Sequence, residues 1–280
     1  MSDRDASSGR WREGRTIGNP FGIGEGVAGL LAGFLASVVA VGSYAALVHL
    51  PAGATTYGTD VVSLLVLWTG LVGAVVTATR LHAPARKGTG PGGIAPAGAG
   101  HLFAAGRGSG TGSVVQDFGL RLRPWPDIPL GLVAGVGAQL LLVPLLEAPL
   151  MPFVHHLSER LGHPTTQLLG STSGAGLVVL SILVCAGSPL VEELFFRGLV
   201  LRALLGRLEH LGQRLAPALS IVLSGLVFAL AHFEALQLIG LAGFGIVLGY
   251  LAFRTGRLGS SIVAHVAFNS TTVIWYVVHH

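Results

Sequence analysis

The chain has 280 residues, of which 51% are hydrophobic and 11% charged, and its mean hydropathy is +0.70. Soluble domains carry about 25% charged residues, so this chain has too few charges to cover a water-exposed surface. The composition argues against a soluble enzyme, a nucleic-acid-binding domain and a disordered chain. Its net charge of +4 does not indicate nucleic acid, because the basic residues lie at the ends of apolar runs. The composition therefore predicts a polytopic membrane protein.

Residues 1–24 are polar and charged, and we expect a disordered cytoplasmic segment there. Apolar runs of spanning length follow at 25–49, 61–79, 128–150, 175–206, 216–233, 236–253 and 259–278. Because lipid offers the backbone no hydrogen-bond partner, these runs should be helices. The fold class is therefore all-α, a transmembrane helical bundle of about seven to eight spans. The fourth run would extend about 48 Å, and we expect Pro189 to kink it or divide it into two half-helices.

The basic residues orient the bundle. With seven spans and the N-terminus inside, the inner segments hold fourteen Lys and Arg residues, whereas the outer segments hold only Arg160. Cytoplasmic segments are enriched in Lys and Arg. We therefore expect a cytoplasmic N-terminus and an outer C-terminus, and the Gly-, Ala- and Arg-rich composition suggests a bacterial plasma membrane.

Two connecting segments receive no chemical role. Residues 81–127 form a Gly- and Pro-rich cytoplasmic loop within an N-terminal helical part, 25–150. The GxGxxG match at residues 88–93 lies in this loop without a preceding strand or following helix, so we expect no nucleotide binding. Residues 151–173, with three histidines, are interpreted as an interfacial outer loop.

Polar side chains follow single helical faces in three of the last four apolar runs, which points to a cavity within the C-terminal four helices. Ionisable groups inside a membrane usually face the bundle interior and mark function. The three stripes are Ser181, Cys185, Ser188 and Glu192; Ser224, Phe228 and His232; and Ser261, His265, Asn269, Thr272 and Tyr276.

Glu193 precedes Arg197 by four residues, a spacing that allows an ion pair within one helix. This pair would leave Glu192 available. A carboxylate, two imidazoles and an amide suit amide hydrolysis by activated water, with a carboxylate accepting the proton and amide or imidazole donors stabilising the oxyanion. One Glu and two His could instead bind a divalent metal. The sequence contains no HExxH motif and no serine nucleophile elbow.

Three motifs occur in order: Glu192-Glu193-Leu194-Phe195-Phe196-Arg197, then Phe228 four residues before His232, then His265 four residues before Asn269. They read EExxxR, FxxxH and HxxxN. Over about residues 175–275 the chain resembles the CPBP group of intramembrane proteases, which includes the type II CAAX prenyl endopeptidases. We expect a CPBP-like protease domain over 174–278.

The resemblance implies that Glu192 and His232 activate water, that His265 and Asn269 stabilise the oxyanion, and that Glu193 and Arg197 support them. It implies a peptide or protein substrate that is membrane-associated or of CAAX type, prenylated substrates being one option. We expect no cofactor, since Asn is a poor zinc ligand; if a metal such as zinc is present, Glu192, His232 and His265 would bind it. Membrane lipid is the other expected partner.

Two other classes of function remain open from the sequence. An ion- or proton-coupled transporter would also place Glu and His in the membrane, but it would be expected to show internal inverted repeats. A non-catalytic or immunity-type membrane binding protein would keep the same residues without turnover.

Overall fold

The computed structural model describes residues 21–51, 53–83 and 110–279, and these are helical apart from turns and connections, with no strand among them. The α-helices are α2 (Ile23–Leu47), α3 (Tyr57–Leu81), α4 (Val114–Asp117), α5 (Pro124–Gly137), α6 (Val143–Glu147), α7 (Leu157–Gly170), α8 (Ala175–Ile182), α9 (Ser188–Glu192), α10 (Leu201–Arg207), α11 (Gly212–Leu230), α12 (Leu238–Thr255) and α13 (Gly259–His279). Short π-helical segments join several of them: η1 (Ala138–Leu142), η3 (Leu183–Gly187) and η4 (Glu193–Val200). The 3₁₀ turns are η2 (Ala148–Leu150) and η5 (Glu209–Leu211). The proposed disordered N-terminus up to residue 20, and the glycine-rich match at 88–93, lie outside the described residues.

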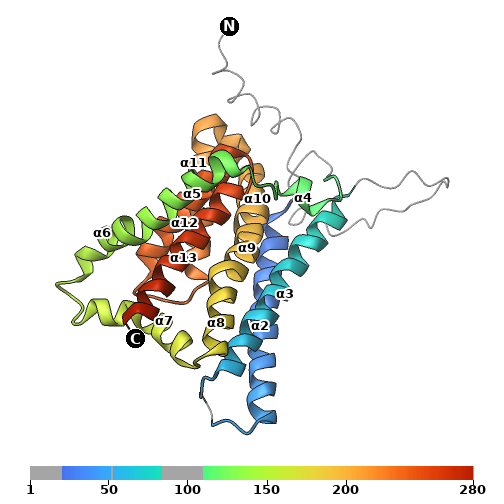
Figure 1. Cartoon of the computed structure of the whole chain (residues 1–280). Helices are drawn as coiled ribbons and strands as arrows, with labels where there is room; N and C mark the ends of the chain where they lie inside the picture. The colour runs from blue at the N-terminus through green and yellow to red at the C-terminus, as the bar shows by residue number, and fades with distance from the viewer. Residues whose placement is uncertain (1–20, 52, 84–109, 280) are drawn as a thin grey trace.

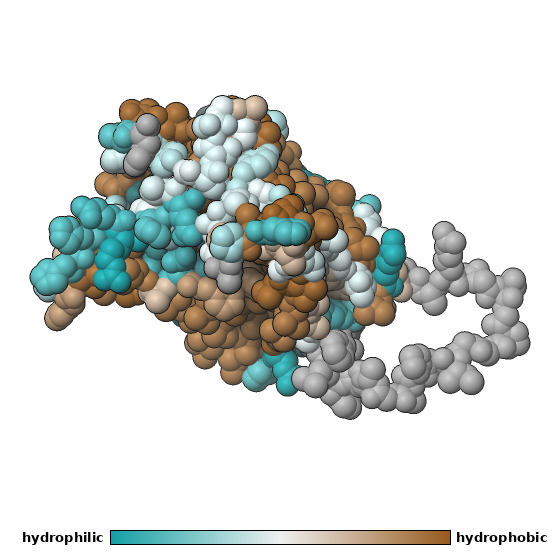
Figure 2. All heavy atoms as spheres, turned by 90° about the horizontal axis from the view of Figure 1, so that it is seen from below, coloured by the Kyte–Doolittle hydropathy of each residue, from teal (hydrophilic) through white to brown (hydrophobic). Residues whose placement is uncertain are grey.

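Seven helical stretches in the described part of the chain are long and apolar enough to cross a membrane. They are Ile23–Leu47, Tyr57–Leu81, Pro124–Leu150, Ala175–Arg207, Glu209–Leu230, Leu238–Thr255 and Gly259–His279. The predicted polytopic helical bundle is confirmed. Many large aliphatic side chains on its outside are exposed, such as Leu35, Val38 and Val39, each about two-thirds exposed. Figure 2, seen from the end of the molecule that lies at the bottom of Figure 1, shows hydrophobic residues over much of the view, beside hydrophilic ones.

The fourth span is a single helical stretch, so of the two alternatives expected at Pro189, a kink or a division into two half-helices, the division was wrong. It passes Pro189 through the π-helical turn η3, in which the N–H of Ser188 bonds to the carbonyl of Leu183 five residues earlier. A wider turn of this kind absorbs the missing N–H and the ring of proline without separating the two parts.

The outer loop expected over 151–173 contains a helix, α7. Its leucines at 157, 161, 168 and 169 recur at helical spacing, and Leu157 and Leu169 are buried while Ser158 and Glu159 are exposed. Because this helix has only 14 residues and a polar face, it does not qualify as a span.

Three helix pairs and one long helical stretch make up most of the packing (Figure 1). α2 packs along α3, α11 along α12, and α5 along α13, while α8, α9 and α10 run through the middle. The main core surrounds η4 and includes Phe195, Phe196, Phe228, Phe244 and Leu248. A second, smaller core consists of Leu169, Leu180 and Val273, from α7, α8 and α13.

Glycines lie where two of these pairs approach most closely. Gly225 of α11 faces Gly245 of α12, and a Cβ on Gly245 would lie 2.8 Å from the Cα of Gly225. On α5, a Cβ on Gly135 would overlap the carbonyl oxygen of Ala264 in α13. Only glycine permits such backbone contact, and both contacts lie beside helices that carry the polar stripes.

Candidate active site

Glu192, His232 and His265 come together from three separate spans. The Oε2 atom of Glu192 lies 3.9 Å from Nε2 of His232 and 3.9 Å from Nε2 of His265. Glu192 ends α9, His232 follows the end of α11, and His265 lies in the second turn of α13. The structure therefore brings together the carboxylate and the two imidazoles whose meeting the sequence predicted.

Both imidazoles present the same nitrogen to Glu192 because their other nitrogen is occupied. Nδ1 of His232 lies 2.8 Å from the carbonyl oxygen of Phe228, and a carbonyl can only accept, so Nδ1 carries a hydrogen. Nδ1 of His265 donates across 3.0 Å to Oε1 of Glu193. In a neutral imidazole the remaining nitrogen, Nε2, is then a free acceptor.

Glu193 and Arg197 form a fully buried ion pair, with Nη1 of Arg197 2.8 Å from Oε1 of Glu193 and both side chains 0% exposed. Arg197 also donates to the carbonyl oxygen of Gly245 at 3.0 Å, and its guanidinium lies 4.4 Å from the centre of the Phe228 ring. The pair therefore connects α12 and α11 to the helix that carries Glu192. Glu193 connects it further to His265, which the sequence analysis did not anticipate.

Asn269 lies one turn beyond His265 on α13, and its Nδ2 donates across 2.8 Å to the carbonyl oxygen of Val184. This carbonyl is available for a local reason. In the π-helical turn η3 it would pair with the N–H of residue 189, which is a proline and has none. Among the contacts found in the described part of the chain, none joins Asn269 to Glu192 or His232. Asn269 is therefore held one turn from His265 by its bond to Val184, and its role at the site stays a prediction.

Aromatic rings enclose the imidazoles on the packed side. The Phe228 ring lies 4.6 Å from that of His232 and 5.6 Å from that of His265, and Phe244 lies 5.5 Å from His265. Phe228 belongs to a motif that the sequence analysis identified, whereas the contacts of Phe244 and Gly245 with the site were missed. They lie on α12, the one helix of the last four without a polar stripe, so no polar pattern indicates those contacts.

The three groups differ in exposure. The side chain of His265 is 4% exposed, that of Glu192 17% and that of His232 31%. Oε2 of Glu192 has no hydrogen-bond partner. An unpartnered carboxylate oxygen that faces two imidazole nitrogens is a place where a water molecule or a cation would gain strong interactions.

Glu192, His232 and His265 have the chemistry of a zinc site but not its spacing. Ligand atoms on a tetrahedral zinc ion lie about 3.3 Å apart, as follows from zinc–ligand bonds of about 2.0–2.1 Å. The two separations measured between their atoms are both 3.9 Å. Within the described residues, no group of three or more His, Cys, Asp or Glu side chains is arranged to hold a metal ion.

Comparison with known proteins finds a matching family model for the segment that contains this site. Residues 174–271 match the family model described as type II CAAX prenyl endopeptidase Rce1-like. The matched segment begins just before α8 and ends within α13, so it contains all the residues discussed above. No curated protein and no solved structure matches the chain.

Proposed function

Since residues 174–271 belong to the Rce1-like family of type II CAAX prenyl endopeptidases, we propose that this integral membrane protein is an endopeptidase in which Glu192 activates water inside the bilayer. The single observation that carries the proposal is the unpartnered Oε2 of Glu192, 3.9 Å from the Nε2 atoms of two histidines. A peptide segment of a membrane-associated protein is the proposed substrate, and CAAX-type proteins are one group of such substrates.

Counting protons assigns the roles. A water molecule between Glu192, His232 and His265 has two hydrogens to give, while an ionised carboxylate and two neutral Nε2 atoms would offer three acceptors. An additional proton on one group would match the donors to the acceptors. We place it on His265, because that imidazole donates from Nδ1 to the buried Glu193 carboxylate and, once protonated, also donates from Nε2.

The charges of the buried cluster then balance. Glu192 and Glu193 are negative, Arg197 and protonated His265 are positive, and His232 is neutral. Burying a net charge in a low-dielectric bundle costs several kcal/mol, and this distribution avoids that cost. In it Glu192 is ionised and able to accept a proton.

The reaction follows from these roles. Glu192 accepts a proton from water while the water oxygen attacks the peptide carbonyl carbon, and Nε2 of His232 accepts the hydrogen bond from the other water hydrogen. The carbonyl oxygen becomes an oxyanion that accepts a hydrogen bond from Nε2 of His265 and one from the second Nδ2 hydrogen of Asn269. When the carbon–nitrogen bond breaks, the proton held by Glu192 passes to the departing amine.

Replacing Glu192 by Gln tests the proposal, because it keeps the size of the side chain and removes the base. Loss of a general base typically costs about 10²–10⁴ in rate. Peptides cut from membrane proteins, compared by mass spectrometry between cells with the wild-type chain and cells with Glu192→Gln, should disappear in the variant. Glu209→Gln, the same change at an exposed glutamate, should leave them unchanged.

An unaltered set of membrane peptides in Glu192→Gln, with the variant inserted at normal yield, would overturn the endopeptidase proposal. It would favour the non-catalytic binding function that the sequence left open.

We further propose that water activation in this site needs no metal, because Glu193 is committed to Arg197 and His265, which leaves one carboxylate and two imidazoles that each lie 3.9 Å from it. Long incubation with a membrane-permeant chelator should then leave proteolysis unchanged, and elemental analysis should find less than one metal ion for each purified chain. Activity that is lost with the chelator and returns with added zinc would contradict this part of the proposal and leave the endopeptidase intact.

A further inference from the structure

The imidazole of His232 takes its hydrogen-bond partner from the way in which α11 ends. In a continuing α-helix the N–H of residue 232 would bond to the carbonyl of Phe228. Instead the last turn of α11 tightens, and the N–H of His232 bonds at 3.2 Å to the carbonyl of Ala229, one residue later. The Phe228 carbonyl is left for the side chain of His232, whose Nδ1 lies 2.8 Å from it. Nε2 therefore stays free to face Glu192.

The residue that closes this turn has an unusual backbone. Phe233 has a φ of +55°, in the left-handed region, where the Cβ of an L-residue crowds the following carbonyl oxygen. Its N–H bonds to the carbonyl of Leu230 at 3.2 Å, and the left-handed backbone then turns the chain out of the helix. Glycine or asparagine commonly has this conformation after a helix, whereas a bulky residue rarely does.

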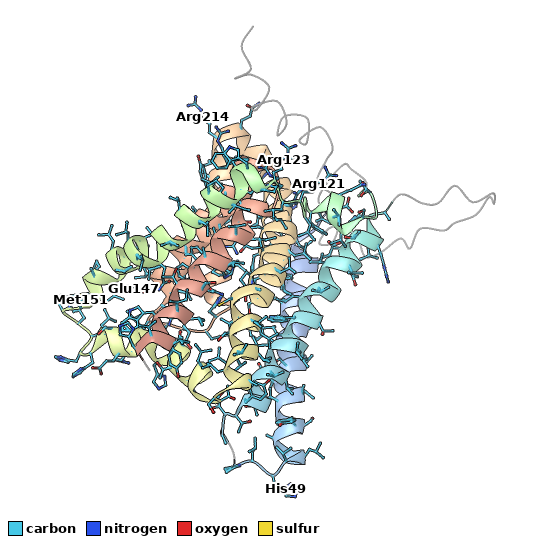
Figure 3. The ribbon with its side chains drawn as sticks, viewed as in Figure 1. His49, Arg121, Arg123, Glu147, Met151 and Arg214 are labelled. Carbon is cyan, nitrogen blue, oxygen red and sulfur yellow. The ribbon has the colours of Figure 1, made fainter. Side chains whose placement is uncertain are left out.

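Phe233 also differs from the other left-handed residues of this protein. In the described part of the chain, two further residues other than glycine have a positive φ, His49 and His156. Histidine is among the residues that tolerate this conformation, and neither position adjoins a site residue in the sequence. His49 lies at one end of the molecule (Figure 3), and His156 immediately precedes α7. A strained backbone beside a reacting group often serves to orient that group.

The strain at Phe233 is held by contacts from outside the last four spans. The side chain of Phe233 is 77% exposed, so its own burial offsets little of the strain. Its ring meets that of Phe34 in α2 edge-on, with ring centres 4.9 Å apart. At the other end of the same connection, Nε2 of Gln237 donates across 2.7 Å to the carbonyl of Leu161 in α7. Both α2 and α7 lie outside the segment that matches the family model, and together they fix the connection that carries His232.

We propose that Phe233 is a positioning residue for His232. Its left-handed backbone, held in place by Phe34, ends α11 at the point where the Phe228 carbonyl becomes available to the imidazole. This bond keeps the hydrogen of His232 on Nδ1, so that Nε2 accepts the hydrogen bond of the attacking water. The consequence for catalysis rests on the proposed endopeptidase function, whereas the tautomer does not.

The reverse case shows what the left-handed backbone prevents. If residue 233 leaves the left-handed region, the helix can continue and the N–H of residue 232 can bond to the Phe228 carbonyl. The imidazole of His232 then loses the acceptor that holds it and can carry its hydrogen on Nε2 instead. In that tautomer Nε2 is a donor and cannot accept from water.

Substitutions of Phe233 that favour or oppose the left-handed conformation test the proposal. Phe233→Gly and Phe233→Asn favour it, whereas the β-branched Phe233→Val opposes it. All three remove the ring that contacts Phe34, so differences among them report on the backbone alone. The tautomer is read from the nitrogen chemical shifts of detergent-purified protein in which only the histidines are isotopically labelled. The His232 signals are those that are missing from His232→Gln.

We expect the Gly and Asn variants to keep the hydrogen of His232 on Nδ1, and Phe233→Val to give a mixture of tautomers. Proteolysis should follow the tautomer. In Phe233→Val, kcat should fall by about 10²-fold, the loss that a small misplacement of a catalytic group causes, while KM changes little. Phe153→Val, the same change at an exposed phenylalanine before α7, should alter neither the tautomer nor kcat.

A wild-type tautomer of His232 in Phe233→Val would overturn the inference. Gly and Asn variants that lose the tautomer as completely as the Val variant would overturn it too, because the ring and not the backbone would then hold the imidazole. If Phe233→Val does not fold, Phe233→Ala replaces it, since alanine keeps the Cβ and loses the contact with Phe34, and the same outcomes apply. The tautomer is measured without turnover. Failure of the endopeptidase proposal would therefore be seen in the peptide analysis, and failure of this inference in the nitrogen spectra.

Discussion

Two consecutive glutamates have opposite environments, and the site depends on this difference. Successive helical residues point about 100° apart, so Glu193 reaches Arg197 on its own helix and His265 on α13, while Glu192 faces the Nε2 atoms of His232 and His265. Oε1 of Glu193 is engaged by Arg197 and His265, whereas Oε2 of Glu192 lies 3.9 Å from both imidazoles and has no hydrogen-bond partner. In our proposal Glu193 holds the charge and orientation of His265, and Glu192 does the chemistry.

Truncating either member of the buried ion pair should destabilise the whole bundle. Glu193→Ala leaves the Arg197 guanidinium buried without its carboxylate, and Arg197→Ala leaves the Glu193 carboxylate buried without its guanidinium. Each change should lower the free energy of unfolding by about 3–5 kcal/mol. The measurement is the midpoint of thermal unfolding in detergent, which should fall clearly for both. Arg254→Ala, at an exposed arginine, should leave it nearly unchanged. Midpoints equal to that of the wild type for both buried variants would contradict the pairing.

The sequence predicted the residues of the site better than their contacts. The i, i+4 spacing sufficed for Glu193 with Arg197 because both lie on one helix. The bond from His265 to Glu193 joins residues 72 positions apart on different helices, and no periodicity within one helix reports such a contact. Asn269 lies in the same polar stripe as His265, but its bond to Val184 depends on the π-helical turn before Pro189. The sequence analysis assumed regular α-helices, so it could not predict this turn or the bond.

At the scale of the elements, length and hydropathy predicted the seven spans because lipid sets both quantities. Length and hydropathy failed where packing or local backbone geometry determines whether a segment is helical. α7 is too short and too polar to be recognised by hydropathy, and its formation depends on Leu157 and Leu169 finding a core. The fourth span stays continuous because a π-helical turn accommodates Pro189, and local backbone adjustments of this kind leave no trace in composition.

The contact between α5 and α13 sets the position of His265 and can be tested with two glycines on the same helix. A methyl group at Gly135 would collide with the carbonyl of Ala264, the residue before His265, whereas a methyl group at Gly137 would meet nothing within 4 Å. Gly135→Ala should therefore push α13 away, destabilise the bundle by about 1–3 kcal/mol and lower proteolysis. Gly137→Ala should be neutral or slightly stabilising. Unfolding midpoints and peptide release measure both effects, and equal behaviour of the two variants would contradict this account of the interface.

At the scale of the whole molecule, packing and charge are both polarised along the bundle. The dense core surrounds η4 and the inner parts of α11, α12 and α13, next to the end of the bundle where Arg121, Arg123 and Arg214 lie together (Figure 3), while a core of three residues serves the other half. Charged termini of helices fix a direction in the membrane, so the direction of insertion decides on which side of the membrane the dense core around η4 lies.

Seven spans place the two termini on opposite sides of the membrane, and the arginines predict which terminus is cytoplasmic. A fluorescent protein that matures only in the cytoplasm should fluoresce when fused before residue 1 and remain dark when fused after His280. Alkaline phosphatase, which is active only outside the cytoplasm, should give the reverse. If the long fourth stretch instead crossed the membrane twice, the chain would have eight spans and both fusions would report the same side. Fluorescence from both ends would therefore contradict the single continuous span Ala175–Arg207. Fluorescence from the C-terminal fusion alone would keep the seven spans but reverse their direction.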